Sequence, residues 1–84
     1  MSWSIELTFQ ALRDLGSLDR LVARRVIAKL ERTTEDPHRF FSRIAGSDDY
    51  KLRVGDYRVL AGLVHETKTV LVMRVDHRSR IYER

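Results

Sequence analysis

Apolar and polar residues alternate at the start of the chain, and the spacing then becomes helical. The alternation is typical of a short strand with one buried face, whose apolar members are Trp3, Ile5 and Leu7. Thr8 can cap the helix that follows, and Gly16 is expected to end it. Ser17 is then expected to open a longer helix, in which apolar residues recur at three- and four-residue intervals: Leu18, Leu21, Val22, Val26 and Leu30. This order predicts one strand followed by a two-helix hairpin.

The helical region is predicted to end at Asp36-Pro37, because the residue before a proline avoids the helical conformation. Residues 38 to 49 show no clear period and are expected to form a loop. From Tyr50 to Val64 the period is two, which is typical of strands. Gly55-Asp56 interrupts this period with the glycine-first pair of a two-residue type II′ turn. The second half of the chain therefore begins with a β-hairpin.

This turn would fix which side chains face each other across the hairpin. Arg53 then lies opposite Arg58, and Lys51 lies opposite Leu60 on the same face. The other face is almost wholly apolar, with Tyr50, Leu52, Val54, Tyr57, Val59, Ala61 and Leu63. Like charges directly opposite one another destabilise a strand pair, so the three cations indicate a bound anion. The alternative is a solvated sheet face on which the charges splay apart.

A last strand is expected from Thr69 to about Val75, with Arg74 on the polar face. Leu71, Met73 and Val75 are predicted on the core face, which requires an odd-length loop or a bulge in the preceding hairpin. The chain thus reads as one strand, two helices and three further strands. We expect an α+β fold in which helices cover one face of an antiparallel sheet, formed by residues 1–84 as a single domain.

The net charge of +4 is not spread evenly along the 84 residues. Residues 1–50 balance eight Lys/Arg with eight Asp/Glu, whereas residues 51–84 hold eight basic and four acidic side chains. A one-sided basic surface indicates a polyanion ligand, although charge also serves solubility. The absence of cysteine excludes disulfides, thiolate metal sites and a cysteine nucleophile. Short apolar runs and no visible signal peptide predict a soluble, cytoplasmic protein without a membrane partner.

The stretch from Tyr50 to Val59, YKLRVGDYRV, resembles the central strand pair of RelE-family toxins. Val75-Asp76-His77-Arg78 followed by Tyr82 is similar to the C-terminal motif of that family, and looser similarity extends upstream to Trp3. The resemblance implies the RelE-like order β-α-α-β-β-β and the toxin role in a type II toxin–antitoxin system. It also implies a ribosome-dependent endoribonuclease that cleaves mRNA in the A site. The implied partners are a RelB-like antitoxin, the ribosome and mRNA, with operator DNA bound only through the antitoxin.

Carried over position by position, the resemblance assigns catalysis to Lys51, Arg53, Arg58, Arg78 and Tyr82. Attack by the 2′-hydroxyl on the adjacent phosphate needs a base, an acid and cations, but no metal ion. Arg58 and Arg78 suit the cation role because a guanidinium is a permanent, bidentate donor. Lys51 is the more plausible proton carrier, because neighbouring cations favour its neutral form. Tyr82 would stack on a base, position the attacking hydroxyl or anchor the C-terminus.

Arg53 departs from the family, which has a second lysine at this position; arginine stabilises charge but is a poor base. Further cations assigned to RNA binding are Arg74, Arg80 and Arg84. The spacing of His38 and His65 suggests no metal site and no cofactor. His77 is expected on the side of the strand away from Arg78, in a structural role.

Two other functions remain compatible with the sequence. ParE-like toxins share the fold and poison DNA gyrase as binding proteins. A catalytically silent nucleic-acid-binding module would use the same basic sheet. Retention of Lys51, Arg58, Arg78 and Tyr82 favours the ribonuclease.

Overall fold

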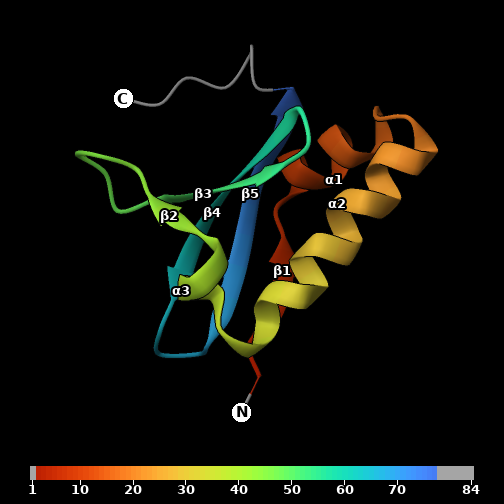
Figure 1. The fold of residues 1–84 in the computed structure, drawn as a ribbon. Coiled ribbons are helices and arrows are strands. Elements are labelled where there is room, and N and C mark those ends of the chain that lie inside the picture. The colour runs from red at the N-terminus through yellow and green to blue at the C-terminus, as the bar shows by residue number, and fades with distance from the viewer. Residues whose placement is uncertain (1, 78–84) are drawn as a thin grey trace.

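A computed structural model describes residues 2–77. The elements follow the predicted order with three additions between the second helix and the hairpin (Figure 1). Their bounds are β1 Ser4–Leu7, α1 Phe9–Gly16, α2 Arg20–Arg32, the 3-10 turn η1 Thr33–Glu35, α3 Pro37–Phe40, β2 Ser42–Arg43, β3 Tyr50–Val54, β4 Tyr57–Val64 and β5 Thr69–His77. Within residues 2–77, no helix has the length and apolar character needed to cross a membrane.

The strands form one five-stranded sheet in the order β1-β5-β4-β3-β2. β1 runs parallel to β5, and the other three pairings are antiparallel. Helices α1 and α2 lie together on one side of the sheet (Figure 1). The core between these layers is built largely from small and β-branched residues, such as Ala11, Val26, Val59, Ala61 and Val72. The predicted α+β architecture is confirmed.

The first helix is capped at both ends by short polar side chains. The Thr8 hydroxyl accepts a hydrogen bond from the Ala11 amide, as predicted. Ser17 was expected to open the second helix, and this prediction is wrong. The Ser17 hydroxyl donates to the Asp14 carbonyl at 2.8 Å, so it caps the end of α1. α2 begins three residues later, at Arg20.

Residues 38 to 49 hold more regular structure than the predicted loop. Pro37 occupies the first position of the short helix α3, where its missing amide hydrogen costs nothing. Ser42 and Arg43 of β2 then pair with Lys51 and Tyr50 of β3. β2 therefore covers only the start of β3 and leaves the outer edge of its remaining residues without a strand neighbour in the described part of the chain.

A bulge, one of the two irregularities that the predicted parity allowed, occurs in β5, but its position changes the faces of two residues. Leu60 pairs with Arg74 and Ala61 pairs with Val72, so Met73 is the extra residue of β5. Before the bulge Val70 and Val72 face the core, and Leu71 and Met73 are only half-buried. The placement of Leu71 and Met73 on the core face is therefore wrong, because the bulge falls at Met73 itself and not ahead of both residues. Val75 is buried as predicted.

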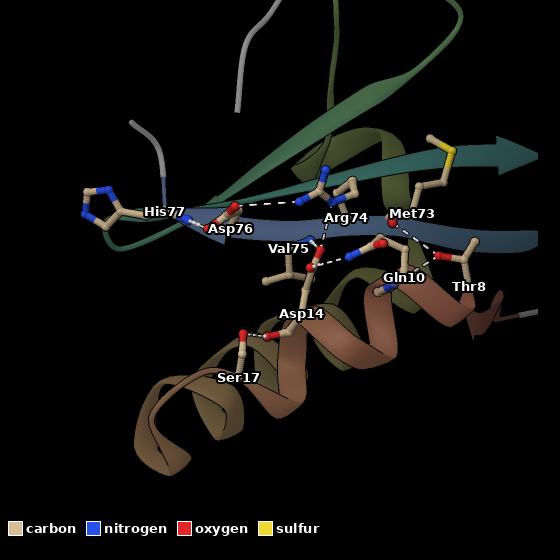
Figure 2. Close-up of polar contacts among 10 residues, drawn as sticks. Thr8, Gln10, Asp14, Ser17, Met73, Arg74, Val75, Asp76 and His77 are labelled. Atoms are coloured by element: carbon tan, nitrogen blue, oxygen red, sulfur yellow. Dashed lines mark hydrogen bonds and ion pairs between the residues drawn. The ribbon is translucent and has the colours of Figure 1, made fainter. Parts of the chain in front are cut away.

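The carboxylate of Asp14 joins α1 to β5 beyond the point where β1 ends (Figure 2). Its Oδ2 accepts hydrogen bonds from the Val75 amide and from Arg74 Nε, both at 2.9 Å, and Gln10 donates to Oδ1. Burial on its own would raise the pKa of Asp14, but these hydrogen bonds from Val75, Arg74 and Gln10 outweigh it and lower the pKa below its ordinary value of 3.8. Ionised Asp14 is thus the form that the fold stabilises.

We predict that Asp14→Ala lowers the free energy of unfolding by about 1–3 kcal/mol at neutral pH, because it strands the buried Val75 amide. The folded-state pKa of Asp14 is depressed, so its contribution is present above the unfolded-state pKa and is lost as the pH falls through the folded-state value. Urea unfolding at several pH values should therefore show that the difference in unfolding free energy between wild type and Asp14→Ala becomes smaller at acidic pH.

Asp48→Ala is the matched control, because the Asp48 side chain is 98% exposed in its ion pair with Arg43. This change should leave the unfolding free energy nearly unchanged, since exposed ion pairs contribute little. Equal losses for the two variants, or a loss at Asp14 that does not depend on pH, would contradict the assigned role.

Candidate nucleic-acid interface

A pocket of about 340 Å³ lies along the uncovered part of β3, and residues of α2, α3, β2, β3 and β4 border it. Five cationic side chains from four elements line it: Lys29 of α2, Arg39 of α3, Lys51 and Arg53 of β3, and Arg58 of β4. Phe40, Ser42 and Leu52 complete the lining, which holds no carboxylate among the described residues. We call this site the basic pocket.

The predicted hairpin register is confirmed and explains why three of these cations meet. Gly55 has a φ of +60°, which glycine adopts readily, at the tip of the two-residue turn. The turn places Arg53 opposite Arg58 and Lys51 opposite Leu60. Arg53 is exposed, whereas Lys51 and Arg58 are half-buried. The close spacing of like charges is therefore built into the strand pairing.

Lys29 and Arg39 are pocket residues that sequence reasoning missed. Arg39 was assigned to a loop, but Pro37 starts a helical turn that carries it to the pocket. Lys29 lies in the last turn of α2, and its Nζ is 5.7 Å from the centre of the Phe40 ring, within the range of a cation–π interaction. The signal available in the sequence was Pro37, since proline is favoured at the first position of a helix.

Arg74 lies on the same sheet face but does not line the basic pocket. Its Nε is bonded to Asp14, and its Nη2 is 3.7 Å from Asp76 Oδ2. Asp76 in turn lies directly opposite Arg58 in the neighbouring strand. Arg74 therefore acts in the fold as a bridge between two carboxylates, and its assignment to RNA binding stays a prediction.

The remaining predicted site residues, Arg78, Arg80, Tyr82 and Arg84, lie outside the described residues. His77 pairs with Tyr57, on the side of the sheet away from Arg58, and their rings meet edge to face at 5.4 Å. No group of three or more potential metal ligands occurs among residues 2–77.

A second surface is apolar and belongs to the other edge of the molecule. Four large apolar side chains are exposed on α1 and α2: Phe9, Leu12, Leu21 and Ile27. Ile27 also borders a pocket of about 210 Å³, which is lined by Ile5, Leu7, Leu30 and Glu31 as well. We call this pocket together with the four exposed apolar side chains the apolar groove. Exposed apolar area of this kind marks interaction sites.

Comparisons with known proteins identify the family of this chain. Residues 5–82 match the sequence model of a family described as ParE toxin of type II toxin–antitoxin system, parDE. Toxin RelG of Mycobacterium tuberculosis is 34% identical over 89 residues, and the match covers all of both chains.

Solved structures give the same result. A chain of the M. tuberculosis toxin–antitoxin complex RelBE2 superposes with a TM-score of 0.87 at 27% identity, covering 93% of this chain and 100% of that one. A chain of the intact E. coli RelBE toxin–antitoxin complex superposes with a TM-score of 0.76 at 25% identity, covering 98% of this chain and 99% of that one. The chain therefore belongs to the RelE/ParE superfamily of toxins from type II toxin–antitoxin systems.

Proposed function

We propose that the protein is a ribosome-dependent endoribonuclease that cleaves mRNA in the A site and so inhibits translation. The observation that carries the proposal is the basic pocket, where five cations converge with no lining carboxylate among the described residues. Such a pocket stabilises a polyanion, and it suits the extra negative charge that develops on a phosphate during attack. The similarity to Toxin RelG, which extends over the full length of the chain, supports the proposal of a RelE-like activity.

The chemistry proposed is attack by the RNA 2′-hydroxyl on the adjacent phosphate. The 2′-hydroxyl gives up its proton as the 2′-oxygen bonds to phosphorus, and the bond between phosphorus and the 5′-oxygen breaks. The 5′-oxygen takes up a proton, and the products are a 2′,3′-cyclic phosphate and a 5′-hydroxyl. Arg58 and Arg53 hold the phosphate oxygens, and Lys51 carries a proton. Arg78 is expected to add a further clamp and Tyr82 to contact the nucleotide. This reaction requires no metal ion, because the attacking group is already part of the substrate.

Gyrase inhibition is the second candidate function, because the matching family is described as ParE toxin. A gyrase inhibitor acts by binding and has no need of a phosphate pocket. The convergence of Lys51, Arg53 and Arg58 in one pocket therefore favours the ribonuclease. A non-catalytic nucleic-acid-binding module would use the same pocket without cleavage.

We further propose that a RelB-like antitoxin holds the toxin inactive and links it to operator DNA. The RelBE2 and RelBE structures are toxin–antitoxin complexes, and this chain superposes on a chain of each. The apolar groove offers a place for the antitoxin, since Leu21 is 68% exposed and Phe9 is 77% exposed. An acidic segment that continues to the basic pocket would mask both surfaces.

The proposed function is tested by incubating the purified protein with mRNA-programmed ribosomes and, separately, with DNA gyrase. We expect cleavage of mRNA in the A site and no effect on supercoiling. Inhibition of gyrase without RNA cleavage would establish the second candidate instead. Binding of RNA without either activity would establish the non-catalytic module.

Variants of the basic pocket serve as controls for that experiment. Arg58→Ala should slow cleavage by about 100- to 1,000-fold, as removal of a transition-state donor typically does. Lys51→Arg keeps the charge but removes the proton carrier, so cleavage should fall while RNA binding survives. Arg24→Ala removes an exposed cation outside the pocket and should cleave normally. Full activity of Arg58→Ala or Lys51→Arg would contradict the assigned roles.

We predict that Arg39 contacts an RNA phosphate, because it lines the basic pocket opposite the strand cations. Arg39→Ala should weaken binding of a single-stranded RNA oligonucleotide and reduce the slope of log K against log salt by about 0.7, the value for one lost phosphate contact. Fluorescence anisotropy at several salt concentrations measures both quantities. Arg24→Ala again serves as the control, and an unchanged slope in Arg39→Ala would exclude the contact.

We predict that Leu21→Glu weakens capture by the antitoxin and leaves RNA cleavage intact, because Leu21 belongs to the apolar surface and not to the basic pocket. Desolvating a charge at an apolar contact is costly, so the dissociation rate should rise. Surface plasmon resonance with the cognate antitoxin measures this rate. Arg20→Glu makes a larger charge change, from positive to negative, at an exposed neighbouring residue and should still have the smaller effect. Equal antitoxin affinity for wild type and Leu21→Glu would show that the groove is not used.

A further inference from the structure

Two histidines from distant parts of the sequence meet at the end of the sheet that is remote from His77. His38 lies in α3, and His65 follows β4 in the turn before β5. Their Nε2 atoms are 2.9 Å apart, although 27 positions separate the residues in sequence. Both residues are exposed, so their ring nitrogens are accessible to ions from solution. We call these two residues the histidine pair.

Aromatic rings hold the histidine pair in place. The Trp3 ring meets His65 edge to face at 5.3 Å and His38 at 6.3 Å. The Tyr50 ring packs edge-on against His38 at 5.8 Å. The two imidazoles lie nearly parallel, with an angle of 21° between their planes and 5.1 Å between their centres. Their nitrogens therefore point toward each other within a preformed aromatic setting.

The separation of the two nitrogens suits a transition-metal ion as well as a shared proton. Metal–imidazole bonds are about 2.0–2.1 Å long, so two such bonds place the nitrogens about 2.9 Å apart at a right angle and about 3.3 Å apart at the tetrahedral angle. Right-angled ligands are typical of Cu²⁺ and Ni²⁺, and tetrahedral ligands of Zn²⁺. A tilt of each ring would redirect both lone pairs toward one ion, and exposure leaves room for that tilt.

We propose that His38 and His65 form a binding site for one divalent transition-metal ion of the Zn²⁺, Ni²⁺ and Cu²⁺ class. The Nε2 atoms are the two protein ligands, and water fills the other positions, because no third ligand side chain gathers there among the described residues. The bound ion fastens α3 to the turn between β4 and β5. This site is separate from the basic pocket and does not rest on the proposed function.

The chain carries its own reporter for this site. Trp3 is the single tryptophan of the sequence, and His38, His65 and His77 are its three histidines. Cu²⁺ quenches tryptophan fluorescence at short range, and the Trp3 ring lies beside both members of the histidine pair. His77 belongs to the far end of β5, where it contacts Tyr57, and provides the matched control.

We expect tag-free protein to show saturable quenching by Cu²⁺, with one ion per chain. His38→Ala and His65→Ala should each weaken the apparent affinity by at least the roughly 10- to 100-fold that follows loss of an outer-shell partner. His77→Ala should titrate like wild type. Zn²⁺ should raise the melting temperature of wild type and His77→Ala, and not of the other two variants.

Quenching that persists in both His38→Ala and His65→Ala would place the ion elsewhere, such as the amino terminus two residues before Trp3, and would overturn the proposal. Nuclear magnetic resonance of wild-type protein tests the same point without a substitution. Zn²⁺ should shift the ring signals of His38 and His65 and leave those of His77 in place. Equal shifts for all three histidines would also overturn it.

Discussion

The structure depends on the bond between the Asp14 carboxylate and the backbone of β5. β1 spans four residues and β5 spans nine. On the side of β5 that faces β1, the residues after Val72 therefore have no strand beside them in the described part of the chain. Helix α1 takes the place of the missing strand. Thr8 donates to the carbonyls of Val72 and Met73, and Asp14 accepts from the Val75 amide. Each of these backbone groups would otherwise be left unsatisfied next to the core.

This edge contact also organises the charged face of the sheet. Asp14 of α1 forms an ion pair with Arg74, and Arg74 also lies near Asp76. Asp76 in turn lies opposite Arg58 in the neighbouring strand. Carboxylates thus lie along β5, while the charged residues that line the basic pocket beside β3 are all cationic. Repulsion within that pocket is tolerated because the opposite face of the hairpin buries Leu52, Val59 and Ala61 in the core.

Local patterns predicted the hairpin well and predicted contacts between distant segments poorly. Gly55-Asp56 specifies a turn of known geometry, so the register of Arg53 and Arg58 followed from the sequence. Parity allowed an odd-length loop or a bulge, but it did not give the position of the bulge at Met73, which follows directly after Val72, the last residue of β5 that pairs with β1. Arg39 and Lys29 enter the site through the packing of α3 and α2 against the sheet, and periodicity carries no information on such packing. The meeting of His38 with His65 escaped notice for the same reason.

The two exposed surfaces constrain the kind of protein that can silence this toxin. The apolar groove begins at β1 and the basic pocket lies beside β3 and β2, and β1 and β2 are the opposite edges of the sheet. The described part of the chain measures 32 × 27 × 22 Å, so one partner that masks both surfaces must reach from one edge of the sheet to the other. A compact domain would contact one edge and leave the other open. An extended chain covers such a distance with about ten residues at 3.3–3.6 Å each. The separation of the surfaces thus favours an antitoxin segment that is disordered alone and becomes ordered as it wraps the toxin, because only a flexible chain follows both edges at once.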